Sequence, residues 1–158
     1  MPLRRAERCS LKKEDSFMAD IVNDRKEINE AIVAGDMALN SLYAAQEKLD
    51  SAKGWSWLDM FGGGFLTDMI KHSKMDEASR CMENAKYNLK KFQKELSDIN
   101  LSLDLRMEVG GFLSFADFFF DGLVADYLVQ SKIEDARRQV ADAINMISSI
   151  LNTLRDTV

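Results

Sequence analysis

The sequence predicts an all-α protein: an elongated bundle of three long coiled-coil-like helices joined by two short aromatic-rich helices. The 158 residues contain one proline, Pro2, and are rich in Ala, Leu, Met, Glu, Lys and Asp, most of which favour helices. Apolar residues recur every seven positions in three separate segments, as they do along a coiled-coil seam. The length suits one domain with its own core, and we expect residues 14–158 to form a single helical-bundle domain.

The first thirteen residues differ from the rest of the chain. Segment 1–13 carries five basic residues and a single acid, Glu7, and it has no apolar face. We expect a disordered basic N-terminal tail, although such a tail could also contact anionic lipid or nucleic acid. The whole chain has a formal net charge of -5 and a pI near 5.0, so we expect no general nucleic-acid binding.

The three long helices are expected over residues 15–53, 74–109 and 132–156. One seam position holds Ala31, Ala38 and Ala45, then Ala78, Ala85, Phe92 and Ile99, then Ala136, Ala143 and Ile150. The other holds Gly35, Leu42 and Leu49, then Met82, Leu89, Leu96 and Leu103, then Val140, Ile147 and Leu154. Small residues in this seam would let the helices approach closely, and leucines would fill wider gaps.

An internal repeat relates the middle of the chain to its end. Residues 54–100 align without a gap with residues 112–158, and twelve of the 47 aligned pairs are identical. Four segments fit a capping box, in which an N-cap serine and an acid three residues later satisfy free backbone N–H groups. These segments are Ser56–Asp59, Ser73–Asp76, Ser114–Asp117 and Ser131–Glu134. We therefore interpret each repeat as a short helix, over 57–71 or 115–129, followed by a long one.

The two short helices are apolar around most of their circumference. A helix of this kind is buried against its own protein or meets a partner, because exposed it would form a large apolar patch. We take the large aromatic residues of these connectors as a possible interaction surface. They are Trp55, Trp57, Phe61, Phe65, Phe112, Phe115, Phe119 and Phe120.

The glycine-rich stretch "FGGGFLTDMIKHSK" raises the question of a ligand loop. It has neither the spacing of a P-loop nor that of a dinucleotide fingerprint, and no strand precedes it. Of its three glycines, only Gly64 is kept in the repeat, as Gly122. The glycines therefore indicate close helix packing or a local bend, with shallow membrane insertion as the alternative.

His72 is the single histidine of the chain and a candidate metal ligand. Asp68 and Asp76 lie four residues to either side, a spacing that brings side chains to one helical face. The box at Ser73 predicts a helix break there, however, and the repeat places Gln130 at the matching position. We expect no metal, no cofactor and, because no nucleophile has a recognisable base beside it, no enzymatic activity.

The segment "GWSWLDMFGGGFLTDMIKHSKMDEA" resembles uncharacterised bacterial helical proteins that carry a Gly-Trp…Gly-Gly-Gly…Lys-His…Asp-x-Ala pattern between long helices. The resemblance covers about residues 28–100. It implies no activity and is in keeping with a bacterial, cytoplasmic protein.

The remaining features favour a cytoplasmic interaction protein. Cys9 and Cys81 are isolated, unlike a secreted disulfide framework, and no apolar run has the length of a signal peptide or a membrane span. We predict a non-enzymatic protein–protein interaction or scaffold protein, whose partner is another protein or a second copy of itself. The alternative is a peripheral membrane protein that uses the aromatic connectors and the basic N-terminus.

Overall fold

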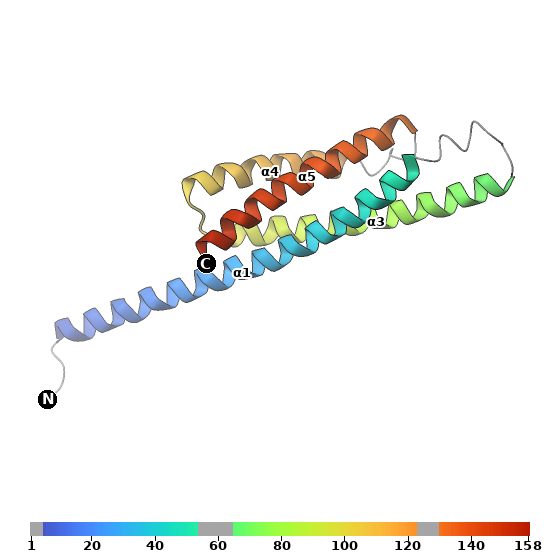
Figure 1. The fold of residues 1–158 in the computed structure, drawn as a ribbon. Coiled ribbons are helices and arrows are strands. Elements are labelled where there is room, and N and C mark those ends of the chain that lie inside the picture. The colour runs from blue at the N-terminus through green and yellow to red at the C-terminus, as the bar shows by residue number, and fades with distance from the viewer. Residues whose placement is uncertain (1–4, 54–64, 123–129) are drawn as a thin grey trace.

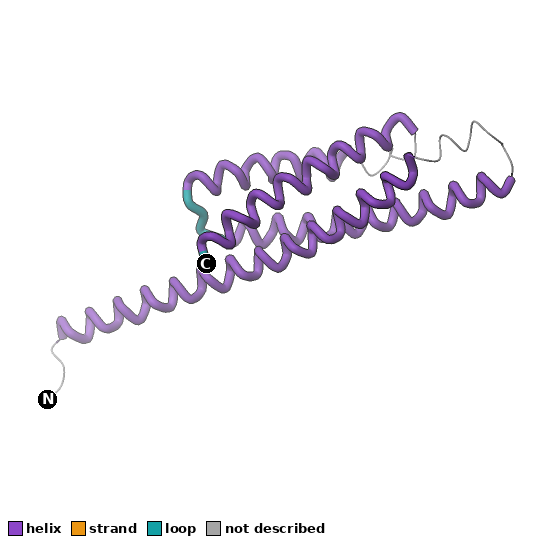
Figure 2. Tube along the Cα trace, in the orientation of Figure 1, coloured by secondary structure: helices purple, strands orange, loops and turns teal. Residues whose placement is uncertain are grey.

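The computed structural model describes the backbone of residues 5–53, 65–122 and 130–158, and the side chains of residues 11–51, 76–117 and 134–158. Nearly all of this backbone is α-helical, and the described residues contain no strand (Figure 2). The prediction of an all-α fold is therefore confirmed. The described helices are α1 (Arg5–Lys53), α3 (Phe65–Asp98), α4 (Leu103–Gly122) and α5 (Gln130–Thr157).

These helices form an antiparallel bundle in which the chain direction alternates from one helix to the next (Figure 1). Helix α1 packs against α3 and α5, and α4 closes the arrangement by packing against the same two helices. Helices α1 and α4 therefore lie across the core from each other. Helix α1 is much longer than the bundle, and its N-terminal part continues alone beyond the ends of α3 and α5 (Figure 1).

The core follows the seven-residue seam. On α1, α3 and α5, the predicted seam residues inside the helices are buried, from Ala31 to Leu49, Ala78 to Leu96 and Ala136 to Leu154. The two seam residues predicted beyond Asp98 differ, because the helix has ended: Ile99 is half-buried and Leu103 is 73% exposed. Burial of so many apolar side chains is the main stabilising contribution to the fold.

At Gly35, side chains of two neighbouring helices lie close to the backbone of α1. A Cβ atom added to it would lie 2.6 Å from Leu151 Cδ2 of α5 and 2.9 Å from Phe92 Cε2 of α3. Phe92 in turn packs on Phe112 of α4, with ring centroids 5.5 Å apart and the planes tilted by 52°. One glycine on α1 thus admits large side chains from two neighbouring helices, and these side chains link the four described helices at this level.

Two predicted helix boundaries are wrong. Helix α3 continues without interruption through Ser73 and ends at Asp98, so neither the predicted break near residue 73 nor the predicted end at residue 109 exists. The chain reverses over residues 99–102 instead. Helix α4 then begins with a hydrogen bond from Arg106 N to Ser102 O, 2.9 Å long, which makes Ser102 the N-cap residue of α4.

The second connector is also different from the prediction. The segment expected as a short helix over 115–129 belongs to α4, which begins twelve residues earlier, at Leu103, and ends at Gly122. Ser114 is therefore a mid-helix residue, and its Oγ donates to Gly110 O at 3.1 Å instead of capping a helix. Buried residues at a helical spacing fix α4 to the core: Leu105, Val109, Phe112 and Ala116. Helix α4 is thus a fourth bundle helix and not only a connector.

The starts of α1 and α5 can be compared with the remaining predicted boundaries. Helix α1 begins at Arg5, so most of the segment expected as a disordered tail, residues 5–13, is helical. Helix α5 begins at Gln130, close to the predicted start at residue 132 and to the box at Ser131. The box at Ser56 lies outside the described residues.

Candidate interaction surface

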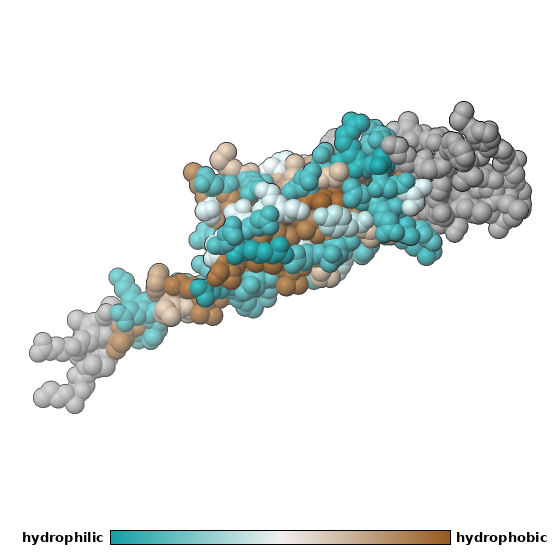
Figure 3. Space-filling view, in the orientation of Figure 1, coloured by the Kyte–Doolittle hydropathy of each residue, from teal (hydrophilic) through white to brown (hydrophobic). Residues whose placement is uncertain are grey.

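The part of α1 that leaves the bundle is the most unusual feature of the structure. We call residues 5–26 the N-terminal extension. Every described side chain in it, from Leu11 to Lys26, is exposed, and Ile28 is the first buried residue of the helix. At a rise of 1.5 Å per residue, the extension is ~33 Å long. Figure 3 shows it as a narrow arm with apolar and polar side chains interspersed.

The extension presents an apolar stripe to solvent. Its large apolar residues are 36% to 64% exposed, and they are Leu11, Phe17, Met18, Ile21 and Val22. Their spacing of three, four and seven residues places them on one side of the helix. On a helical wheel this side runs on into the buried seam that begins at Ile28. The helix therefore keeps a core-forming face after α5 has ended, and only the last turns of α3, which line a pocket together with Val22, Arg25 and Lys26, still lie beside it.

Charged residues frame the stripe. Lys12 and Lys13 are followed by four acids without an intervening base, namely Glu14, Asp15, Asp20 and Asp24, and then by Arg25 and Lys26. All of these side chains are exposed. Glu14 and Arg25 lie within the stripe itself, midway between its two apolar edges. The extension thus combines apolar contact area with an uneven distribution of charge.

Ion pairs join α1 to α3 and α5, and one of them marks the level at which α5 ends. Lys48 Nζ of α1 lies 3.2 Å from Glu77 Oε2 of α3, and the hydrogen bond and charge of this carboxylate raise the pKa of Lys48. Near the C-terminus of α5, Arg155 donates to Asp36 Oδ1 at 2.5 Å. Helix α5 therefore ends close to the level of Asp36, and the part of α1 that precedes this level has no α5 beside it.

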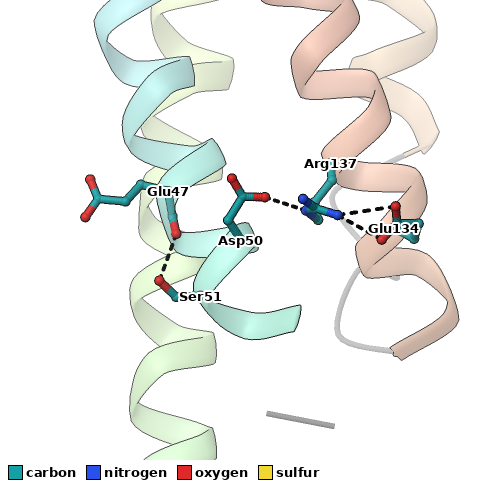
Figure 4. A network of polar contacts seen from close by, with 5 residues as sticks. All are labelled: Glu47, Asp50, Ser51, Glu134 and Arg137. Carbon is teal, nitrogen blue, oxygen red and sulfur yellow. Dashed lines mark hydrogen bonds and ion pairs between the residues drawn. The ribbon is translucent and has the colours of Figure 1, made fainter. Parts of the chain in front are cut away.

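A further polar network ties the opposite end of α5 to α1. Figure 4 shows Arg137 between Asp50 of α1 and Glu134 of its own helix: its Nε donates to Asp50 Oδ1 at 2.5 Å, and one terminal nitrogen donates to both oxygens of Glu134. The hydrogen bond to Asp50, followed by that to Glu134, raises the pKa of Arg137 against the opposing effect of its burial. With Arg155, this residue fixes the register of α5 along α1.

The aromatic residues proposed from the sequence are only partly described. Phe112 is 1% exposed and belongs to the core, so it cannot line a surface, and Phe115 is half-buried against the same core. Phe65, Phe119 and Phe120 lie on helices, but their side chains are outside the described residues, as are Trp55, Trp57 and Phe61 altogether. The described aromatic side chains of this set thus close the bundle.

Metal binding and membrane spanning can be checked on the described residues. Within them, no group of three or more His, Cys, Asp or Glu side chains could hold a metal ion. The side chain of His72 lies outside the described residues, although the helix break that we expected beside it is absent. No helix in the described part of the chain is both long enough and apolar enough to cross a membrane.

The sequence analysis missed the N-terminal extension as a candidate surface. The signal was present, since Phe17 and Ile21 continue the heptad spacing upstream of Ile28. Asp24 and Glu14 interrupt that spacing. The basic residues of segment 1–13 led to the prediction of a disordered tail instead. In the comparisons with known proteins, no protein-family model, no curated protein and no solved structure matches the chain. Its function must therefore be inferred from its own residues.

Proposed function

We propose that this chain is a non-enzymatic protein–protein interaction or scaffold protein, and that the N-terminal extension is its binding element. The observation that carries the proposal is the exposed apolar stripe from Leu11 to Val22, one edge of which, Phe17 and Ile21, continues the seam of the bundle. A helix with such a stripe normally buries it against another helix. The bundle then acts as a rigid base that holds the extension clear of the rest of the chain.

The proposal includes a coiled-coil-like seam and an origin in two related halves. Under the repeat of residues 54–100 and 112–158, the seam residues of α3 correspond to those of α5. Both sets are buried in the bundle: Ala78, Met82, Ala85, Leu89, Phe92 and Leu96 correspond to Ala136, Val140, Ala143, Ile147, Ile150 and Leu154. Equivalent roles at equivalent positions support the repeat, because related segments keep their buried positions.

The cellular location and the resemblance remain parts of the proposal. We propose a cytoplasmic protein on the basis of the two isolated cysteines, Cys9 and Cys81. The resemblance of residues 28–100 to bacterial helical proteins stays a prediction. A peripheral membrane role is the competing hypothesis. It has weaker support, because interfacial helices usually carry Lys or Arg on their polar side and the extension carries four acids between residues 14 and 24.

A photo-crosslinking experiment tests the proposal. A photoreactive phenylalanine analogue replaces Phe17 in the full chain, and the matched control replaces Val33, which is 60% exposed on the bundle part of α1. We expect protein adducts from position 17 and few or none from position 33. In parallel, the chain is floated with vesicles of anionic lipid. Flotation that Phe17→Ser abolishes, without protein adducts from position 17, would contradict the proposal in favour of membrane binding.

A further inference from the structure

We propose that the partner of the N-terminal extension is a second copy of this chain, paired in antiparallel orientation. The proposal rests on the proposed function and specifies its partner. The first argument is continuity with the bundle. Helix α5 runs antiparallel to α1 and ends beside it near Asp36 (Figure 1), which leaves the same side of α1 open along the extension. An antiparallel helix from a second copy would lie beside the extension on the side where α5 lies beside the bundle part of α1.

The apolar residues of the stripe match each other in this orientation. On a helical wheel, Leu11, Met18 and Val22 form one edge of the stripe, and Phe17, Ile21 and Ile28 form the other. In antiparallel pairing, residues from opposite edges share a layer. One register places Met18 level with Ile21 of the second copy and Phe17 level with Val22, and each layer occurs twice by symmetry. The same register places Leu11 level with Ile28 of the second copy, at the point where the bundle begins.

The two charged residues inside the stripe also match in this register. Glu14 and Arg25 lie midway between the two edges, and the register that pairs the apolar residues places Glu14 level with Arg25 of the second copy. Two ion pairs would then lie in the seam, one on each side of the two-fold axis. Buried or partly buried charges are tolerated only when they are paired. The same two residues would be unfavourable against an uncharged apolar partner.

The charges beside the stripe also favour this antiparallel register. On one flank, Lys13 comes near Asp24 and Glu27 of the second copy. On the other flank, Asp15 comes near Lys26, whose Nζ currently lies 3.5 Å from Glu30 Oε1 in an exposed pair on the same helix. Such an exposed pair contributes little and is easily exchanged. Parallel pairing would instead place Glu14 against Glu14 and Arg25 against Arg25, and like charges in a seam are destabilising.

The small contact area favours a weak dimer. Two helical segments of this length form an interface at the small end of the range for protein complexes, so we expect a Kd of ~20 μM. Sedimentation velocity of the full chain between about 1 and about 200 μM brackets such a value. We expect a monomer at the low end and a dimer at the high end.

Charge reversal tests the register. Glu14→Arg alone, or Arg25→Glu alone, places like charges against each other in the seam and should raise the Kd about tenfold or more. The double variant Glu14→Arg/Arg25→Glu restores opposite charges and should recover the dimer. Glu83→Arg, an exposed reversal on α3 far from the extension, is the matched control and should leave the Kd unchanged. Circular dichroism at low concentration verifies that each variant retains its helices.

Several results would overturn the proposal. The full chain could stay monomeric at all concentrations, the single reversals could leave the dimer intact, or the double variant could fail to recover it. Protein adducts from position 17 in a chain that stays monomeric would eliminate the second copy as partner and leave the proposed function standing. A monomer without such adducts would count against both.

Discussion

Gly35 shows how one residue sets the distance between helices. Its missing side chain leaves room for Leu151 Cδ2 and Phe92 Cε2, which would lie 2.6 and 2.9 Å from an added Cβ. Gly35→Ala should gain up to ~1 kcal/mol in helix propensity, but overpacking of a dense core costs about 1–3 kcal/mol. Because both contacts come from buried side chains, we expect a net loss of stability, measured as a lower urea midpoint.

Gly110 is the matched control for this prediction. It also lies inside a helix, and a Cβ added there would meet nothing within 4 Å. Gly110→Ala should therefore raise stability by up to ~1 kcal/mol, the full difference in helix propensity. If the two variants shifted the urea midpoint in the same direction, close packing at Gly35 would not be the reason for its glycine.

Lys48 gives a prediction about pH at the same scale. Glu77 raises the pKa of Lys48 above its ordinary value of 10.5, so the folded state binds this proton more tightly than the unfolded state does. The pair therefore contributes its full stabilisation below the ordinary pKa of 10.5, and this stabilisation is lost as the pH rises through the raised pKa of the folded state. Lys48→Met should lower the urea midpoint at pH 8, and the difference from the wild type should shrink above the raised pKa.

The control for Lys48 is Lys91→Met, because Lys91 is an exposed lysine of α3. Its difference from the wild type should be small and should not change with pH in this way. A Lys48→Met effect that stayed constant up to pH values at which lysines are deprotonated would mean that packing of the lysine stem, and not its charge, stabilises the contact between α1 and α3.

At the scale of elements, α4 is the helix whose role changed most between sequence and structure. Phe112 of α4 is buried and packs on Phe92 of α3. Phe112→Ala should therefore destabilise the protein by about 3–5 kcal/mol, which is typical when a buried phenylalanine is truncated. Met107→Ala on the same helix is the control: this residue is 73% exposed, and its loss should change stability by less than about 0.5 kcal/mol. Equal effects would mean that α4 is not a core helix.

The seam was predictable from the sequence, whereas the helix ends were not. Heptad spacing identifies the buried face of a helix from the residues themselves, which is why the residues from Ala31 to Leu49 were assigned correctly. A serine followed by an acid is a weaker signal, because a mid-helix serine can bond to a carbonyl of the preceding turn, as Ser114 does with Gly110. The actual start of α4 at Ser102 has its first acid two residues later, at Asp104, and so lacks the pattern of a full box.

At the scale of the whole molecule, the exposure of the extension could not be predicted from the sequence, for a different reason. Whether a stripe such as that around Phe17 is covered depends on where α3 and α5 end, and this depends on contacts between distant segments, such as that of Arg155 with Asp36. A periodic pattern indicates which side of a helix can be buried and not whether a neighbour is present. The candidate surface could therefore be recognised only after the ends of the helices were known.

The independence of the bundle from the extension gives a final prediction. All described side chains from Leu11 to Lys26 are exposed, so removing residues 2–24 should remove helical signal without removing core contacts. At about 1 μM, where the dimer is largely dissociated, the truncated and full-length chains should have the same urea midpoint. At higher concentration, pairing stabilises the full-length chain by mass action, and its midpoint should rise while that of the truncated chain stays constant. A truncated chain that unfolds far earlier at 1 μM would mean instead that the extension packs on the bundle.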